Sequence, residues 1–74
     1  MISERVRTLR REQGLKQEEM AEKIGIAYRT YQDLEGGKKP SYDTLLKTAE
    51  ANQVSVDWLM GRTEDRALDR KSVV

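Results

Sequence analysis

Glycine and proline interrupt the chain so often that only short secondary-structure elements fit between them. The interruptions are Gly14, Gly25, Gly36-Gly37, Pro40 and Gly61. Between these positions the apolar residues recur every three or four residues, as on one face of an α-helix, and do not alternate as in a half-buried strand. The spacing therefore predicts an all-α fold, a compact domain of five short helices around one core.

The expected helices span about 3–13, 17–24, 28–35, 42–52 and 56–60. Serines stand where N-caps are needed, at Ser3, Ser41 and Ser55, and Gly14 and Gly25 can end the first two helices in the left-handed conformation. The expected inward-facing residues are Ile2, Val6, Leu9, Met20, Ala21, Ile24, Tyr31, Leu34, Leu45, Leu46 and Ala49. We expect residues 1–61 to form the domain and residues 62–74 to be a charged, flexible tail.

Composition excludes several kinds of chemistry. The 74 residues contain no cysteine and no histidine, so disulfides, thiolate metal sites and the commonest general base are absent. Neighbouring carboxylates such as Glu18 and Glu19 point about 100° apart on a helix and cannot act on one bond together. We expect no catalytic residue, no metal, no cofactor and no small-molecule ligand.

Charge and hydropathy indicate a soluble chain but do not indicate what it binds. The 14 basic and 13 acidic residues leave a net charge of +1, which neither favours nor excludes nucleic acid. No segment approaches the roughly 18 consecutive apolar residues of a membrane span, and no signal-peptide pattern is present. We expect a cytoplasmic protein.

The second and third expected helices form a helix-turn-helix unit. They are joined by the short turn Gly25-Ile26-Ala27. Ala21 is small where the two helices cross, Gly25 permits a sharp turn, and Ile26 fills the angle between the helices. Such a unit lays its second helix in the major groove of DNA.

These residues resemble the phage repressor and Cro-type helix-turn-helix domains of the Cro/cI class. The matching string is GLKQEEMAEKIGIAYRTYQDLEGGKKPSYDTLLKTAE, followed by VSVDWLMG. Six residues fall at the spacing of that family: Gln17, Ala21, Gly25, Glu35, Gly37 and Pro40. The resemblance implies a sequence-specific double-stranded DNA-binding regulator of transcription, a repressor of phage, prophage or bacterial type.

The resemblance also implies roles for individual residues. Base edges would be read by Tyr28, Arg29, Gln32 and Asp33, and phosphates would be contacted by Arg10, Gln17, Thr30, Lys38, Lys39 and Tyr42. Arg29 could form two hydrogen bonds with a guanine, and Gln32 could form two with an adenine. Asp33 can accept only from cytosine in the groove, and it can instead pair with Arg29 four residues earlier. The alternative for Gln17, Lys38 and Lys39 is that these side chains are solvated and contact no phosphate.

Two further expectations follow from the resemblance. Arg10 and Glu35 form a structural pair that fixes the recognition helix. The chain also forms a homodimer on a palindromic operator, through an interface of Val54, Val56, Trp58, Leu59 and Met60, although a core position is the alternative for these residues. Lys16 and Ala27 stand where the family often has Ser or Thr caps, a loss of about 1 kcal/mol each.

A different class of function stays open beside DNA binding. The chain could be a protein-interaction module or an antitoxin that keeps the fold without the groove chemistry. Asp33 and the nearly neutral net charge favour this alternative. The two hypotheses differ in whether the third helix and the basic loop after it form one continuous positive face.

Overall fold

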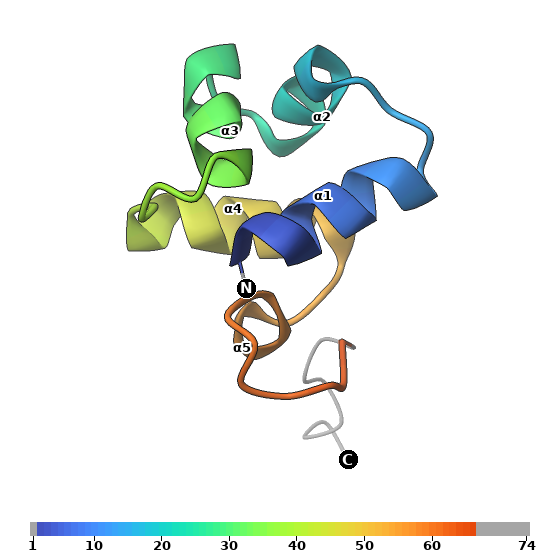
Figure 1. The fold of residues 1–74 in the computed structure, drawn as a ribbon, viewed down its shortest axis with the longest axis vertical. Helices are drawn as coiled ribbons and strands as arrows, with labels where there is room; N and C mark the ends of the chain where they lie inside the picture. Colours follow the sequence, from blue (N-terminus) through green and yellow to red (C-terminus); the bar gives the residue numbers. More distant parts are fainter. Residues whose placement is uncertain (1, 67–74) are drawn as a thin grey trace.

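Five α-helices joined by short turns are seen in the computed structural model, which describes residues 2–66 (Figure 1). They are α1 (Ile2–Glu12), α2 (Gln17–Ile24), α3 (Tyr28–Glu35), α4 (Tyr42–Asn52) and α5 (Val56–Leu59). The predicted all-α fold of five helices is confirmed. The middle three helices have the expected bounds, whereas α1 begins at Ile2 and α5 ends one residue earlier than expected.

Side-chain caps explain where α4 and α5 begin. The hydroxyl oxygen of Ser41 accepts the backbone N–H of Thr44 at 3.2 Å, and that of Ser55 accepts the N–H of Trp58 at 3.0 Å. Ser3 lies inside α1, so the prediction that it caps this helix is wrong.

Helices α2 and α3 also lack a Ser or Thr cap, and they begin in different ways. At α2, the Glu19 carboxylate accepts the backbone N–H of Lys16 at 2.8 Å, which satisfies one of the free donors at that helix start. Ala27 gives α3 no side-chain cap. The start of α3 therefore depends on packing more than the start of α2 does.

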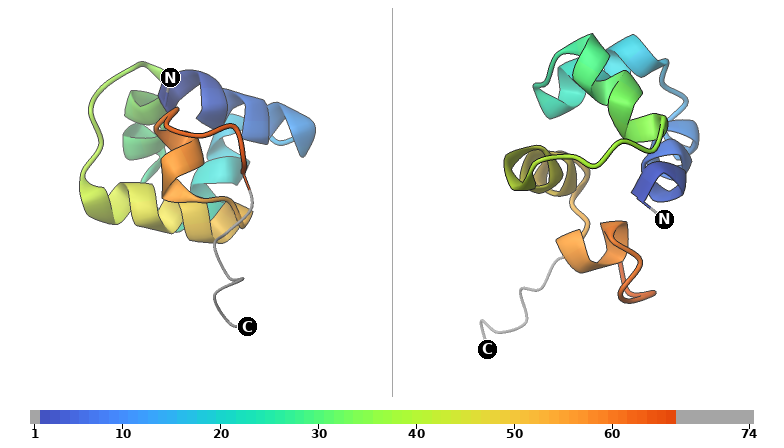
Figure 2. Two further views of the ribbon diagram at one scale, coloured as in Figure 1. Left: turned by 90° about the horizontal axis from the view of Figure 1, so that it is seen from below. Right: turned by 60° about the vertical axis from the view of Figure 1, so that its left-hand side comes forward.

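The helices are arranged in three levels. In Figure 1, α2 and α3 lie at one end, α1 and α4 cross the middle, and α5 lies at the opposite end. Two further views agree with this arrangement (Figure 2). Helix α3 packs against α2 and α1, α2 packs against α4, and α5 packs against α4 and α1. Helix α3 is thus supported from inside and exposes its outer face.

One hydrophobic core joins all five helices. Its buried members are Val6, Leu9, Met20, Ala21, Ile24, Tyr31, Leu34, Leu45, Ala49, Val54, Trp58 and Leu59. Leu46 was expected among them but is only partly buried. Thr48 is fully buried on α4 instead, three residues after Leu45, and its hydroxyl donates to the carbonyl of Thr44 at 2.8 Å.

The segment after α5, residues 62–66, lies against the domain, and we refer to it as the strap. The N–H of Arg62 donates to the carbonyl of Asp57 at 2.9 Å, and the N–H of Ser55 donates to the carbonyl of Arg66 at 3.0 Å. The strap differs in this respect from the flexible tail expected for residues 62–74. Residues 67–74 lie outside the described part of the chain.

The strap is also attached through its side chains. The guanidinium groups of Arg66 and Arg5 lie 4.7 and 4.6 Å from the centre of the Trp58 ring, within the range of cation–π attraction. Arg66 pairs with Glu12 at 2.6 Å, and Arg5 pairs with Glu64 at 3.2 Å. None of the helices in the described part of the chain has the length and apolarity needed to cross a membrane.

Candidate nucleic-acid interface

The turn between α2 and α3 sets the angle at which α3 leaves the domain. Gly25 has φ of +88°, a conformation that side-chain-bearing residues rarely adopt, and its N–H donates to the carbonyl of Ala21 at 2.9 Å. The N–H of Ile26 donates to the same carbonyl at 3.1 Å. Ile26 is half-buried against the core, as expected of a residue that fills the angle between two helices.

The outer face of α3 presents the four side chains predicted to read bases. Arg29 and Gln32 are exposed, Tyr28 is 43% exposed, and Asp33 is partly buried. The Nε atom of Arg29 lies 3.8 Å from Oδ1 of Asp33, so the two form an ion pair along the helix. The structure thus brings the four residues together on one accessible surface.

Basic side chains lie beside this face. Lys38 and Lys39 are exposed and form no ion pair with any residue between 2 and 66. The backbone N–H of Lys38 donates to the carbonyl of Asp33 at 3.0 Å, which holds the loop to the end of α3. Tyr42 follows with 69% exposure, and Thr30 on α3 is half-buried.

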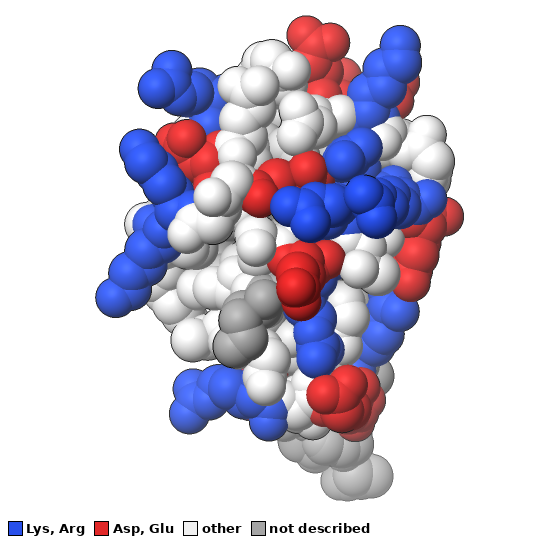
Figure 3. Space-filling model, in the orientation of Figure 1, with Lys and Arg blue, Asp and Glu red and all other residues white. Residues whose placement is uncertain are grey.

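The positive surface is not continuous. Figure 3 shows Lys and Arg side chains along the edge formed by α3 and the loop after it, with acidic side chains among them. Arg29 and Asp33, which form an ion pair, are one example. Lys38 and Lys39 form no ion pair within residues 2–66, but Asp33 places a carboxylate where bases would be read. The continuous positive face that would favour DNA binding over a protein-interaction module is therefore not present in full.

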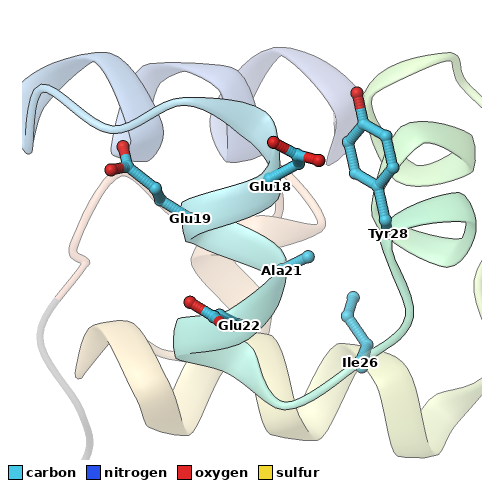
Figure 4. Close-up of a pocket in the computed structure, with 6 residues that line it drawn as sticks. All are labelled: Glu18, Glu19, Ala21, Glu22, Ile26 and Tyr28. Carbon is cyan, nitrogen blue, oxygen red and sulfur yellow. The ribbon is translucent and has the colours of Figure 1, made fainter.

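An acidic groove of about 430 Å³ lies between α2 and the start of α3. Ala21 and Ile26 form its apolar floor, and the remaining lining residues are Glu18, Glu19, Glu22 and Tyr28. Figure 4 shows Glu18 and Tyr28 facing each other from α2 and α3. Three carboxylates make the groove itself unfavourable for a phosphate.

Glu35, the last residue of α3, is the centre of a buried hydrogen-bond network. It is only 7% exposed. Arg10 donates to both of its carboxylate oxygens, from Nε at 2.6 Å and from Nη2 at 3.2 Å. Gln17 donates from Nε2 at 3.0 Å, and the Tyr31 hydroxyl donates to Oε2. The expected Arg10–Glu35 pair is present, and α1, α2 and α3 meet at this carboxylate.

The network determines how its members ionise. Burial alone would raise the pKa of Glu35, but the hydrogen bonds from Arg10, Tyr31 and Gln17 outweigh it and lower the pKa below its ordinary value. Burial and the adjacent carboxylate raise the pKa of the Tyr31 hydroxyl, which therefore remains a donor. Glu35 stays charged and α3 keeps its orientation.

Sequence reasoning missed Arg7 as a member of this network and gave Gln17 and Tyr31 other roles. Arg7 donates from Nη2 to the backbone carbonyl of Glu35 at 3.0 Å, and its Nε lies 3.8 Å from the carboxylate. Its position three residues before Arg10 places the two on one face of α1, a signal that could have found it. Gln17, expected at a phosphate, uses its amide nitrogen on Glu35.

The predicted dimer interface is largely interior within the single chain. Val54, Trp58 and Leu59 are at most 5% exposed. Trp58 and Leu59 belong to α5, which packs against α1 and α4, and Val54 lies just before it. Only Val56 and Met60 are partly exposed and retain surface that a second copy could contact. The homodimer itself stays a prediction.

Comparison with known proteins matches residues 6–59 to the helix-turn-helix family. The chain is 44% identical over 66 residues to an uncharacterized HTH-type transcriptional regulator, YobD, of Bacillus subtilis. It is 37% identical over 62 residues to the cryptic phage CTXphi transcriptional repressor RstR of Vibrio cholerae. These alignments cover 88% and 82% of the chain but 59% and 55% of the relatives, so the chain spans little more than half their length. This chain belongs to the helix-turn-helix family, of the Cro/cI type that its sequence predicts.

Proposed function

We propose that this chain is the DNA-binding part of a transcriptional regulator and that α3 reads duplex DNA in the major groove. The observation that carries the proposal is the exposed outer face of α3, held from behind by the buried Glu35 network. A helix whose inner end is fixed by three other side chains can present its outer side chains in one register. Membership of the helix-turn-helix family and the names of the relatives support the same function.

We assign the exposed residues to two kinds of contact. Arg29, Gln32 and Tyr28 lie on the outer face of α3 and would contact base edges, which carry the sequence information. Lys38 and Lys39 lie on the loop and would contact phosphates, which position the protein without reading sequence. Tyr42 and Thr30 would support the phosphate contacts at the edges. Arg10 was expected there too, but its Nε, Nη1 and Nη2 already donate to Glu35 and to the carbonyl of Leu15, so it would act on phosphates through its charge alone.

Gln17 can serve both the network and DNA. One hydrogen of its amide nitrogen is used on Glu35, and the second is available to a phosphate beside the start of α2. The backbone N–H groups and dipole at that helix start also favour an anion. We therefore keep Gln17 as a phosphate contact that is at the same time connected to the end of α3.

The proposal also covers the oligomeric state, the direction of control and the location in the cell. A homodimer with its two recognition helices about 34 Å apart would match successive major grooves and a palindromic operator. Val56 and Met60 provide the apolar surface left for such contact. One relative is named a repressor, so repression is the proposed direction of control, exerted in the cytoplasm of a bacterium.

Selection of bound sequences from random duplex DNA tests the proposal, with Arg29→Ala and Lys38→Ala compared on the selected site. A palindromic consensus is expected. Arg29→Ala should cost about 1–3 kcal/mol on the preferred site and relax one base position, whereas Lys38→Ala should weaken all sequences equally and lower the salt slope by about 1. If neither change affects DNA affinity, the groove-reading function is wrong, and a protein-interaction module using the acidic groove explains the fold better.

A further inference from the structure

Asp33 is the acidic residue on a surface otherwise suited to DNA. A carboxylate at this place repels phosphates and lowers general affinity for duplex DNA. Its side chain is 37% exposed, while that of its partner Arg29 is 81% exposed. Asp33 is therefore the more fixed member of the pair, and Arg29 is the member free to reach a ligand.

The geometry of the pair leaves the reading end of Arg29 available. The atom of Arg29 that approaches Asp33 is Nε, 3.8 Å from Oδ1. No hydrogen bond joins the terminal amino groups of Arg29 to any residue between 2 and 66, and the approach to Asp33 is closest at Nε. A guanidinium held on its Nε side presents those two amino groups as a fork, the arrangement that matches O6 and N7 of guanine.

The main chain of Asp33 has a separate task. Its carbonyl accepts the N–H of Lys38 at 3.0 Å and so holds the basic loop. A change of the Asp33 side chain leaves that bond available, so the effect of the carboxylate can be tested apart from the effect of the loop.

We propose that Asp33 is a positioning residue that determines specificity: it holds Arg29 on a guanine base and keeps it from phosphates. The inference rests on the proposed function, because it concerns which base α3 prefers. A flexible arginine without a nearby carboxylate contacts any phosphate within reach, which adds affinity for every sequence. With Asp33 beside it, the guanidinium of Arg29 is kept from the phosphates and is held in one orientation. The carboxylate thus lowers general affinity and raises selectivity.

The test measures the affinity of the full chain for the selected duplex, its single-base variants and an unrelated duplex, each at two salt concentrations. Wild-type protein should prefer guanine at the position that Arg29 reads by about 5- to 150-fold, the equivalent of 1–3 kcal/mol. Asp33→Asn should reduce this preference by about threefold or more. It should also raise affinity for the unrelated duplex about two- to fivefold at low salt, because a negative charge is lost.

Two matched variants separate positioning from charge alone. Asp33→Glu keeps the carboxylate on a longer side chain and should retain part of the guanine preference. Asp57→Asn removes an equal charge from an exposed pair with Arg62, whose atoms lie 4.0 Å apart on α5 and the strap. Because α5 lies at the opposite end from α3 (Figure 1), Asp57→Asn should leave the preference unchanged.

The outcomes distinguish this inference from the proposed function. If wild-type protein selects no sequence, the proposed function fails and the inference fails with it. If Arg29→Ala abolishes the guanine preference while Asp33→Asn leaves it intact, DNA reading stands and the role of Asp33 is wrong. If Asp33→Asn weakens every duplex equally and lowers the melting temperature, Asp33 is a structural residue of α3.

Discussion

Arg10 and Arg5 lie on the same helix and attach it to opposite ends of the molecule by different interactions. Arg10 reaches the buried carboxylate of Glu35 on α3, at the end that would face DNA. Arg5 lies against the ring of Trp58 and pairs with Glu64 of the strap, whose side chain is 90% exposed. The two arginines are about equally exposed and both are hydrogen-bonded, but the carboxylate that Arg10 meets is buried, whereas the one that Arg5 meets is open to solvent.

The difference between the two ends follows from solvent screening. At Glu35, hydrogen bonds replace water around both charges, so losing one partner leaves a buried charge uncompensated. At Trp58, each guanidinium keeps contact with water, and the ion pairs that accompany it are weak and screened by salt. We infer that the domain fixes the orientation of α3 strongly and holds the strap loosely.

The largest effect is expected from Glu35→Gln. The neutral amide cannot compensate the Arg10 guanidinium, so the variant should lose about 3–5 kcal/mol of unfolding free energy. Urea unfolding followed by circular dichroism measures this loss. The control is Glu50→Gln on the exposed side of α4, which should stay within about 0.5 kcal/mol of wild type. Equal small losses in the two variants would show that Glu35 does not fix α3.

Acid unfolding should depend on Glu35 more than on an exposed carboxylate. The pKa of Glu35 lies below its ordinary 4.5 in the folded state, so the unfolded state binds more protons as the pH falls. This stabilisation is full above about pH 4.5 and is lost as the pH falls through the lower pKa of the folded state. The unfolding free energy of wild type should decrease in that window, and that of Glu35→Gln should decrease less.

Glu12 is the comparison for this acid effect. Its pKa is also lowered, through the hydrogen bond from Arg66, but its pair lies at the surface. Glu12→Gln should therefore flatten the pH dependence less than Glu35→Gln does. A larger effect of Glu12→Gln would show that the stronger attachment is at the strap and not at α3.

Most of the fold could be predicted because its signals are local. Gly25, Ser41 and Ser55 mark helix ends through their own backbone and cap chemistry, and the structure uses them as expected. Leu46 and Thr48 show the limit of such signals. Hydrophobicity favours burying Leu46, but the rotation of α4 is set by Leu45 and Ala49, which carry Thr48 inward with its hydroxyl bonded to the helix backbone.

The residues assigned to DNA contacts stay a prediction, and the connections among the site's residues could be predicted only in part. The Arg10–Glu35 pair came from family spacing, but the convergence of Arg7, Gln17 and Tyr31 on one carboxylate depends on how three helices meet in space. The strap was missed for a similar reason. A short charged segment carries no periodicity, and its side chains pair with Arg5 and Glu12 on α1, which are more than fifty residues away in sequence.

A moderate effect is expected from Arg66→Gln at the solvent-exposed end. The change removes the cation over Trp58 and the ion pair with Glu12, which together should contribute about 0.5–1 kcal/mol. Trp58 is the only tryptophan, so its fluorescence reports the strap directly and should shift to longer wavelength as water reaches the ring. Arg62→Gln, which loses an exposed pair but no ring contact, should leave the emission unchanged. An unshifted spectrum for Arg66→Gln would mean that the strap does not cover Trp58.

The smallest effect concerns salt and compares both ends in one measurement. Raising NaCl from 0.1 to 1 M shortens the screening length from about 10 to about 3 Å. The stability difference between wild type and Arg66→Gln should therefore shrink by a few tenths of a kcal/mol, because the Arg66–Glu12 pair is half-exposed. The difference between wild type and Glu35→Gln should stay the same within error, because the Glu35 carboxylate is buried and satisfied by hydrogen bonds. Urea unfolding of the three proteins at both salt concentrations gives the comparison. If salt reduces both differences alike, the two attachments are equally accessible to ions, and the contrast between a buried α3 end and an open strap end is wrong.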